Sequence, residues 1–435
     1  MPRPIPDLPK EDWQKPTVKD RDPCHIELIT PMFGGGVATR VNDTTFPIRP
    51  TAIRGQLQFW WRATVGARYE TLKELRAAQS DIWGSTERAS RVQVRLTFNQ
   101  ADIAKPTPCA RFDMQGNTYR SIWNSPFSGQ QNALPYVLFP FQGRLSRDRR
   151  SIEQEPATYI AKASFKLILR CADDLWPQVE PAVWAWVNFG GLGSRTRRGC
   201  GAIRCAEFIP KDADDLAAKW KQCMPQLFPG REWPTLAGPV LLRTVDPAGD
   251  PVRVWNWLIG LLKDFRQGIP FARQGGPGRS HYPEPETIRR ILLDPKRPWR
   301  HGRDKAIPND AFPRAEFGLP IVFHFKPPQE PQDTVLYPSA GVDGKRRERM
   351  ASPLILKPLG LANGNAIPLC LFLNAPPLTG VDLRQGEASL SIPPATKIRD
   401  AALATYARSP LATSANGSAL EAFLAFAKAE SFREV

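Results

Sequence analysis

Residues 189–203 read FGGLGSRTRRGCGAI and combine closely spaced glycines with three arginines. Glycine allows backbone N–H groups to turn outward at positive φ and lets a ligand approach the main chain closely. Arginine adds a fixed charge and planar hydrogen-bond donors. The stretch therefore predicts a loop that holds phosphate groups. Its candidate contacts are Gly191, Gly193, Arg195, Arg197, Arg198, Gly199 and Gly201.

The two common nucleotide-binding motifs do not fit this loop. A P-loop needs G-x-x-x-x-G-K-[ST], but Gly199 lies one place too far from Gly193, and Cys200 stands where the lysine belongs. A dinucleotide fingerprint would need a third glycine where the chain has Thr196. The loop therefore favours a polymer backbone over a mononucleotide.

The segments around the loop also oppose a dinucleotide site. Residues 175–188 have a helical pattern, with a kink or restart expected at Pro181, and residues 202–209 have a strand pattern. The helix C-terminus faces the loop, so no helix dipole attracts an anion here, and the arginines must supply the charge. A solvated basic turn stays open as the alternative.

The charge of the whole chain favours a polyanionic partner. The sequence holds 59 Lys+Arg against 43 Asp+Glu, a formal net charge of +16, and the sequence pI is about 9.7. Arginines recur in every segment and do not form one basic tail, which suits an extended groove for nucleic acid.

Length and composition indicate a globular protein of two or three domains. The chain has 435 residues, 42% of them hydrophobic, with 13 tryptophans. The N-terminus has no apolar signal region, and the longest apolar run, residues 254–262, is too short to cross a membrane. Seven cysteines without a C-x-x-C pair predict reduced, buried thiols and a cytoplasmic protein. No metal, cofactor or membrane partner is expected.

Proline- and glycine-rich loops separate short strand patterns and helix patterns, which predicts an α+β fold. We expect two related α+β units: an N-terminal extension at 1–22, a first domain at 23–212, a connecting helix region at 213–237 and a second domain at 238–435. Strands are expected at 25–30, 92–98, 136–141, 164–171, 202–209, 239–245, 319–326, 351–358 and 367–373. Helices are expected at 51–66, 175–188, 213–223, 251–267, 285–293 and 419–428.

A second motif follows the first strand pattern. Residues 30–36 read TPMFGGG and residues 49–62 read RPTAIRGQLQFWWR. Apolar residues recur at helical spacing from Ile53 to Trp60, and we expect them to pack in the core. Arg49 and Arg54 lie at the expected helix start, where free N–H groups favour an anion, so they are candidate phosphate contacts. Arg62 lies on the stripe of Arg54, beside the apolar one, and is also a candidate RNA contact.

These motifs resemble the RAMP proteins of type III-B CRISPR (Cmr) effector complexes. The GQLQFWWR core at 55–62 is a specific match, and residues 190–201 resemble the glycine-rich loop of the family, placed between its last helix and last strand. The resemblance implies a pair of ferredoxin-like (RRM-like) domains. It also implies a role in seating the 3′ region of CRISPR RNA and capturing target RNA beside other Cmr subunits, with Arg49, Arg54, Arg195, Arg197 and Arg198 as the first RNA contacts.

Two other functions stay open at the level of the sequence. Some relatives cut RNA without metal, which requires a general acid or base such as histidine. His25 and His324 lie in strand patterns and predict structural roles, His301 lies in a basic loop, and His281 is the best catalytic candidate. No base and partner can be paired by spacing, so we expect no enzyme activity. The remaining alternative is an assembly adaptor with mainly protein contacts.

Overall fold

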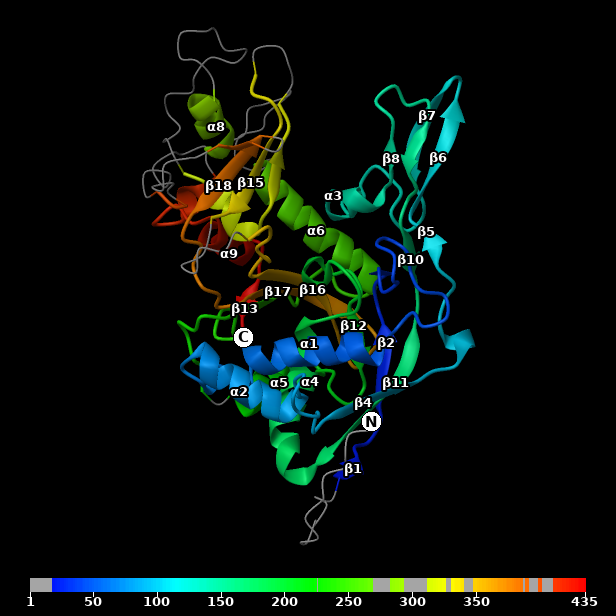
Figure 1. Cartoon of the computed structure of the whole chain (residues 1–435), viewed down its shortest axis with the longest axis vertical. Helices are drawn as coiled ribbons and strands as arrows, with labels where there is room; N and C mark the ends of the chain where they lie inside the picture. Colours follow the sequence, from blue (N-terminus) through cyan, green and yellow to red (C-terminus); the bar gives the residue numbers. More distant parts are fainter. Residues whose placement is uncertain are drawn as a thin grey trace, which may run out of the picture.

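The computed structural model describes residues 18–224, 226–268, 282–292, 311–325, 330–339, 347–385, 388–390, 398–400 and 410–435. Within these residues the chain forms two antiparallel sheets with helices packed on them, together with smaller sheets inserted into each half (Figure 1). The mixed α+β class predicted from the sequence is confirmed.

The first sheet has the order of a ferredoxin-like fold. Its elements follow the chain as β-α-β-β-α-β: β2 (Cys24–Leu28), α1 (Pro50–Ala63), β4 (Gln93–Thr97), β11 (Ser164–Ala172), α4 (Trp176–Phe189) and β12 (Ile203–Cys205). The strands lie side by side as β4-β11-β2-β12, all antiparallel, and β1 (Val18–Asp20) extends the sheet along β11. The first and third strands are therefore central, as in a split β-α-β unit.

The second sheet repeats this order. Its elements are β13 (Val240–Leu242), α6 (Pro251–Gln267), β16 (Leu354–Gly360), β17 (Ala366–Phe372), α9 (Ala419–Ala429) and β20 (Arg433–Glu434). The strands lie as β16-β17-β13-β20 and are antiparallel. The two halves thus share one topology, although the domain limits at 212 and 238 stay predictions.

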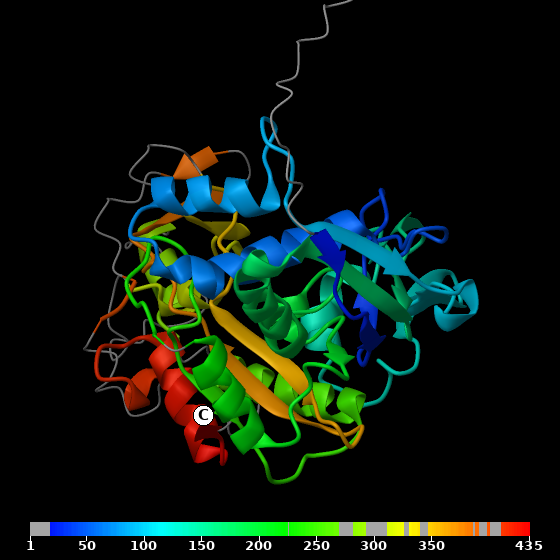
Figure 2. The ribbon, with the colours of Figure 1, turned by 90° about the horizontal axis from the view of Figure 1, so that it is seen from below.

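The second sheet lies between two layers of helices. Every residue of β16 and β17 is buried. Ile355 and Leu359 belong to the core that also contains α1 and α4, whereas Leu354 and Leu356 belong to the core around α6 and α9. Because side chains alternate along a strand, one face of β16 meets each helical layer (Figure 2). The helices α1 and α4 are therefore enclosed between the two sheets.

Each half carries an insertion. Between β4 and β11 the chain builds an arm that projects from the body (Figure 1), formed by the hairpin β6 (Ala110–Gln115) and β7 (Thr118–Trp123) and by α3 (Pro135–Leu138), β8 (Arg144–Leu145), β9 (Ile152–Gln154) and β10 (Thr158–Ile160). Between α6 and α9 lies a sheet of β14 (Ile321–Phe323), β15 (Thr334–Pro338), β18 (Val381–Gln385) and β19 (Ala388–Leu390), with α8 (Glu284–Leu292) nearby.

Most of the predicted elements are present. The helices at 213–223 and 251–267 are confirmed with the same limits, as α5 (Ala213–Cys223) and α6. α4 continues through Pro181 without a restart. The strand expected at 202–209 ends at Cys205, where Phe208 and Ile209 turn back and donate to its carbonyl.

The strand predicted at 136–141 is wrong. Pro135 starts the short helix α3, and a 3₁₀ turn at Phe139–Phe141 follows. Val137 and Leu138 are buried in the same core as α6, so the apolar run packs as a helix. The helix α2 (Leu72–Trp83) was missed, although Thr71 and Glu74 form a capping box at its start. No helix in the described parts of the chain is long and apolar enough to span a membrane.

Candidate nucleic-acid interface

The glycine-rich loop is bound to the segment that follows β2. Thr30 Oγ1 donates to the carbonyl of Gly199 over 2.6 Å and accepts from the N–H of Ala202 over 2.8 Å. The N–H of Ser194 donates to the carbonyl of Phe33 over 2.8 Å. The structure therefore brings together the two motifs that the sequence singled out, and Thr30 fixes the C-terminal end of the loop.

The protein's own backbone fills the space beside the glycines. Gly193 has a φ of +76°, and a Cβ there would lie 2.3 Å from the carbonyl oxygen of Phe33. Gly201 has a φ of +63°, and its Cβ would lie 1.9 Å from the carbonyl oxygen of Leu192. At Gly191 the nearest atom is the carbonyl oxygen of Gly201, and at Gly199 it is a ring atom of Trp255. These glycines allow the loop to fold tightly. The need for close packing therefore explains why glycine stands at these positions, in addition to the predicted contact with RNA.

Arg195 is the exposed arginine of the loop. It has a left-handed backbone (φ 57°, ψ 28°), which turns the chain at the start of the 3₁₀ turn Thr196–Arg198. Its guanidinium lies 5.9 Å from the ring centre of Phe139 and 5.6 Å from that of Phe141, at the base of the arm. The structure gives its N–H donors no hydrogen-bond acceptor within the described part of the chain, so they remain available to a ligand.

Arg197 and Arg198 hold the loop against the second half of the chain. Arg197 donates to the carbonyl of Ser352 and lies over the ring of Phe59 at 5.4 Å. Arg198 donates to the carbonyls of Leu354 over 2.7 Å and of Phe317 over 3.2 Å. Their first role is therefore structural, because these donors join the glycine-rich loop to β16 and its surroundings.

Four arginines gather here without acidic partners. Burial, with smaller contributions from Arg266, Arg197 and Arg195, lowers the pKa of Arg198 to about 9. Burial lowers the pKa of Arg197 to about 10. Both side chains stay charged at neutral pH, and no carboxylate of a described residue lies within ion-pair distance of any of the four. Mutual repulsion in such a cluster is relieved by an anion.

The arginines of α1 point in two directions. Arg49 is the N-cap residue of α1 and pairs with Asp43 over 2.9 Å. Hydrogen bonds from two backbone N–H groups, and the pair with Arg49, lower the pKa of the Asp43 carboxyl group. Arg54 instead donates to the carbonyl of Trp83 at the end of α2, and Arg62 donates to Gln79 of α2 over 3.0 Å. The structure thus separates Arg54 and Arg62 from the loop, because their stripe of α1 faces α2.

Two cavities lie between α1 and the glycine-rich loop. The first, of about 340 Å³, is lined by Arg49, Gly193 and Ser194 among others. The second, of about 200 Å³, is lined by Phe59, Thr196 and Arg197 among others. Gln56 lines both cavities, so they are neighbours, and we call the two together the α1 groove. Sequence reasoning missed Gln56 and Phe59 as groove residues, although Ala52, Gln56 and Phe59 follow helical spacing on one face.

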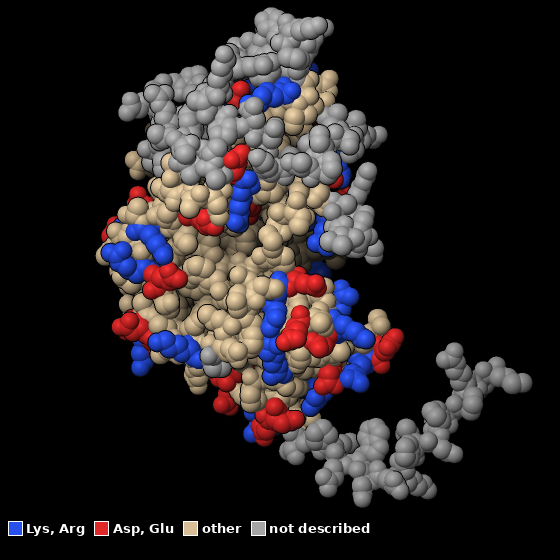
Figure 3. Space-filling model, turned by 90° about the vertical axis from the view of Figure 1, so that its left-hand side faces the viewer, with Lys and Arg blue, Asp and Glu red and all other residues tan. Residues whose placement is uncertain are grey.

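The excess positive charge does not cover the whole surface. On the side shown in Figure 3, acidic and basic side chains alternate over the described part of the lower body, and the hollow at its centre is largely uncharged. Surfaces of mixed sign bind a polyanion weakly. The arginine cluster beside the α1 groove is therefore a better candidate for a nucleic-acid contact than the side shown in Figure 3.

Comparison with known proteins shows which family the first half of the chain resembles. Residues 25–204 match the profile of the RAMP superfamily. Two proteins of Pyrococcus furiosus, the CRISPR system Cmr subunits Cmr1-2 and Cmr1-1, are 26% identical over 187 residues and 25% identical over 194 residues. The matches cover 41% and 44% of this chain, and 91% and 49% of those proteins.

A crystal structure of Cmr1 from Pyrococcus furiosus in its apo form is similar with a TM-score of 0.47 at 16% identity, over 83% of this chain and 89% of that one. The family profile spans β2 to β12, which is the first ferredoxin-like unit together with its glycine-rich loop. The first half of the chain therefore matches the RAMP superfamily, and the chain is similar to the Cmr1 subunits of CRISPR systems.

Proposed function

We propose that this chain is an RNA-binding subunit of a type III-B CRISPR (Cmr) effector complex. In this role it holds the 3′ region of CRISPR RNA and helps to capture target RNA, with other Cmr subunits as its protein partners. The similarity to curated Cmr1 subunits supports its place in such a complex. The arginine cluster supports RNA as the ligand.

The observation that carries the proposal is the unpaired charge beside the α1 groove. Arg195 is exposed and stacked on two aromatic rings, which orients its planar donors without using them. An oriented guanidinium group can bind two phosphate oxygens through two parallel hydrogen bonds, and nucleobases stack on exposed aromatic rings. Arg195 is therefore the first phosphate contact in our proposal. Arg49 is the second, because it lines the α1 groove, although one of its nitrogens pairs with Asp43.

The other arginines of the loop have a supporting part. Arg197 and Arg198 use N–H donors on backbone carbonyls, so they add positive potential and fix the loop more than they bind phosphate directly. Arg54 and Arg62 contribute to the position of α1 against α2. The predicted contacts thus divide into two groups, and mutation can separate them.

Replacing Arg195 with alanine is expected to weaken the binding of single-stranded RNA about 10-fold, or about 1.4 kcal/mol. A phosphate contact is lost, so the slope of log K against log salt should become shallower by about 0.7. Fluorescence anisotropy with a labelled CRISPR RNA at several salt concentrations measures both quantities. Arg76→Ala is the matched control, because Arg76 is an exposed arginine on the outer side of α2.

The control variant should retain wild-type affinity and slope. If Arg195→Ala also retains both, the α1 groove is not the RNA site. Arg195→Lys separates charge from hydrogen-bond geometry, because lysine keeps the charge but lacks the planar guanidinium. This variant should bind RNA more tightly than Arg195→Ala but less tightly than the wild type.

In this proposal the chain binds RNA without cutting it. His25 and His324 are exposed, not enclosed as structural histidines would be, and each pairs with a carboxylate, Glu207 and Asp333, over 2.8 Å. Neither lies in the α1 groove. His281 and His301 lie outside the described residues. No group of three or more metal-binding side chains occurs in the part of the chain that the structure describes.

CRISPR repeat RNA incubated with the purified protein is expected to stay at full length. Denaturing gel electrophoresis over several hours measures this, with and without a chelator. Cleavage that His281→Ala abolishes would instead support the RNA endonuclease alternative. Normal assembly of the complex without any RNA crosslink to this chain would support the adaptor alternative.

A further inference from the structure

A further cavity lies in the second half of the chain. It has a volume of about 620 Å³ and lies where the end of β17, the start of α9 and the segment before β16 meet. This volume is in the range of cavities that bind small molecules or single nucleotides. Among the expected RNA contacts, Arg197 of the glycine-rich loop lines this cavity, whereas Arg49, Arg54 and Arg62 do not.

Arg197 connects this cavity with the α1 groove. The same side chain lines the 200 Å³ cavity next to α1 and the 620 Å³ cavity next to β17. Its guanidinium is fixed by Phe59 on one side and by the carbonyl of Ser352 on the other. With Gln56 and Arg197 as shared walls, the three cavities follow one another across the junction of the two halves.

The positive groups of the large cavity are not neutralised. Arg347 and Arg349 line it and are exposed, and the structure shows no carboxylate in ion-pair contact with them within its described residues. Arg197 also lacks an acidic partner there. Three arginines thus face the cavity with free charge, which favours an anionic ligand.

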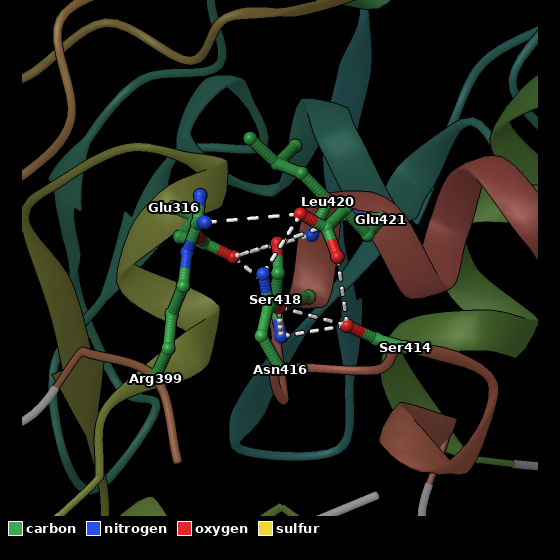
Figure 4. A network of polar contacts seen from close by, with 8 residues as sticks. Glu316, Arg399, Ser414, Asn416, Ser418, Leu420 and Glu421 are labelled. Atoms are coloured by element: carbon green, nitrogen blue, oxygen red, sulfur yellow. Dashed lines mark hydrogen bonds and ion pairs between the residues drawn. The ribbon is translucent and has the colours of Figure 1, made fainter. Parts of the chain in front are cut away.

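Two of the three carboxylates of the cavity are engaged. Glu316 accepts from Arg399 Nε over 2.5 Å, from Ser418 Oγ over 2.9 Å and from the N–H of Ala419 over 2.7 Å, at the start of α9 (Figure 4). Arg399 also lies 3.8 Å from Glu421. Arg399 and the helix N-terminus therefore balance these two carboxylates, and Glu232 at the rim is left as the remaining negative charge.

Much of the remaining wall is apolar, beside the polar side chains of Ser339, Asn374 and Thr379. Met350, Phe372 and Leu424 line the cavity together with several prolines. A nucleobase can pack against such walls while its phosphates meet arginines at the opening, which is the usual way of holding single-stranded RNA. The unpaired arginines, the apolar lining and the connection to the α1 groove through Arg197 all fit single-stranded RNA.

We propose that the 620 Å³ cavity is a second RNA subsite, which receives an unstacked nucleotide of the strand that lies in the α1 groove. The inference rests on the function proposed above. The base packs against Met350 and Phe372, and Arg347 and Arg349 hold the neighbouring phosphates. RNA thus passes from the first ferredoxin-like unit to the second over Arg197.

The test uses a nested series of single-stranded RNAs, each one nucleotide longer, extended in either direction. Anisotropy titrations with the full chain should show a step in affinity once the strand reaches beyond Arg197, about 10-fold for one stacked base. Ala351→Trp fills the cavity from an exposed position, and Arg347→Glu with Arg349→Glu reverses its charge. Both variants should lose the step and keep the affinity for the shortest bound RNA.

The outcomes separate this inference from the proposed function. If no RNA of the series binds the wild-type chain, the proposed function fails. If short RNAs bind but the wild type shows no step, or both variants keep it, the second subsite is overturned. Loss of co-purification with other Cmr subunits in Ala351→Trp, with the RNA series unchanged, would show that the cavity binds protein instead. Lys73→Glu with Arg76→Glu changes the net charge by the same amount at exposed positions of α2 and is the control for charge, and circular dichroism confirms folding.

Discussion

Gly201→Ala is expected to lower the free energy of unfolding by about 3–5 kcal/mol. The φ of Gly201 is +63°, where an L side chain costs about 1–2 kcal/mol. The larger part of the loss comes from space, because the new Cβ would lie 1.9 Å from the carbonyl oxygen of Leu192. That carbonyl belongs to the rigid loop, so the base of the loop must open. Thermal unfolding followed by circular dichroism measures the loss.

Gly116→Ala is a matched control for this prediction. Gly116 has nearly the same φ, +61°, but no atom lies within 4 Å of the Cβ that alanine would add. It turns the β6–β7 hairpin in the arm. Alanine there should cost about 1 kcal/mol, which isolates the backbone contribution. Equal losses in the two variants would contradict the argument from close packing.

The same substitution should also affect RNA binding. Gly201 and Leu192 form the neck of the loop through the 2.8 Å bond from the Leu192 N–H to the Gly201 carbonyl. A displaced neck moves Arg195 away from Phe139 and Phe141, so Gly201→Ala should weaken RNA binding at temperatures at which the protein is still folded. Gly116→Ala should leave RNA binding unchanged.

The sequence predicted the fold well where periodicity and caps agreed. α6 has Pro251 at its first turn and apolar residues at helical spacing, and its limits were confirmed. The run at 136–141 failed because a short apolar segment suits a strand or a buried helix equally. In the folded chain this segment is helical because its apolar side chains pack in the same core as α6. The hairpin of the arm was missed. Most residues of β6 and β7 are exposed or half-buried, so the two strands lack the apolar alternation that indicates a strand.

The candidate site was predicted in part. Spacing indicated that residues 190–201 form a loop, and the resemblance connected this loop with the α1 motif, but spacing could not show what fills the space beside Gly193 and Gly201. The carbonyl of Phe33 occupies the space beside Gly193, and the carbonyl of Leu192 occupies the space beside Gly201. Neither residue is next to its glycine in the sequence. Periodicity also placed Arg54 and Arg62 on one stripe of α1 without telling which neighbour that stripe faces. The neighbour is α2, whose helix had not been predicted.

The junction of the two halves contains one buried amine. Lys357 in β16 is fully buried, and its Nζ donates to the carbonyl of Val187 in the last turn of α4. Burial lowers the pKa of this lysine to about 7. The carbonyls at the C-terminus of α4 favour the charged form only in part. Lys357 therefore couples the packing of β16 on α4 to pH.

The direction of the coupling follows from the two states. In the unfolded chain the amine has its ordinary pKa of 10.5, so between pH 7 and 10.5 the unfolded chain binds the proton and the folded chain does not. The free energy of unfolding should therefore rise with pH across this window, and the contribution should level off above and below it. The difference between 10.5 and about 7 corresponds to at most about 5 kcal/mol.

Lys357→Met should remove this rise, because methionine has a similar length and no proton to bind. Chemical unfolding of the wild type and the variant from pH 6 to 10.5 measures the difference, since other titrating groups act equally on both proteins. The variant should be the more stable protein near pH 7, with the advantage shrinking as the pH rises. Lys162→Met is the control at an exposed lysine and should run parallel to the wild type. Parallel curves for Lys357→Met would mean that the buried amine keeps an ordinary pKa, because an internal water or a shift of β16 solvates it.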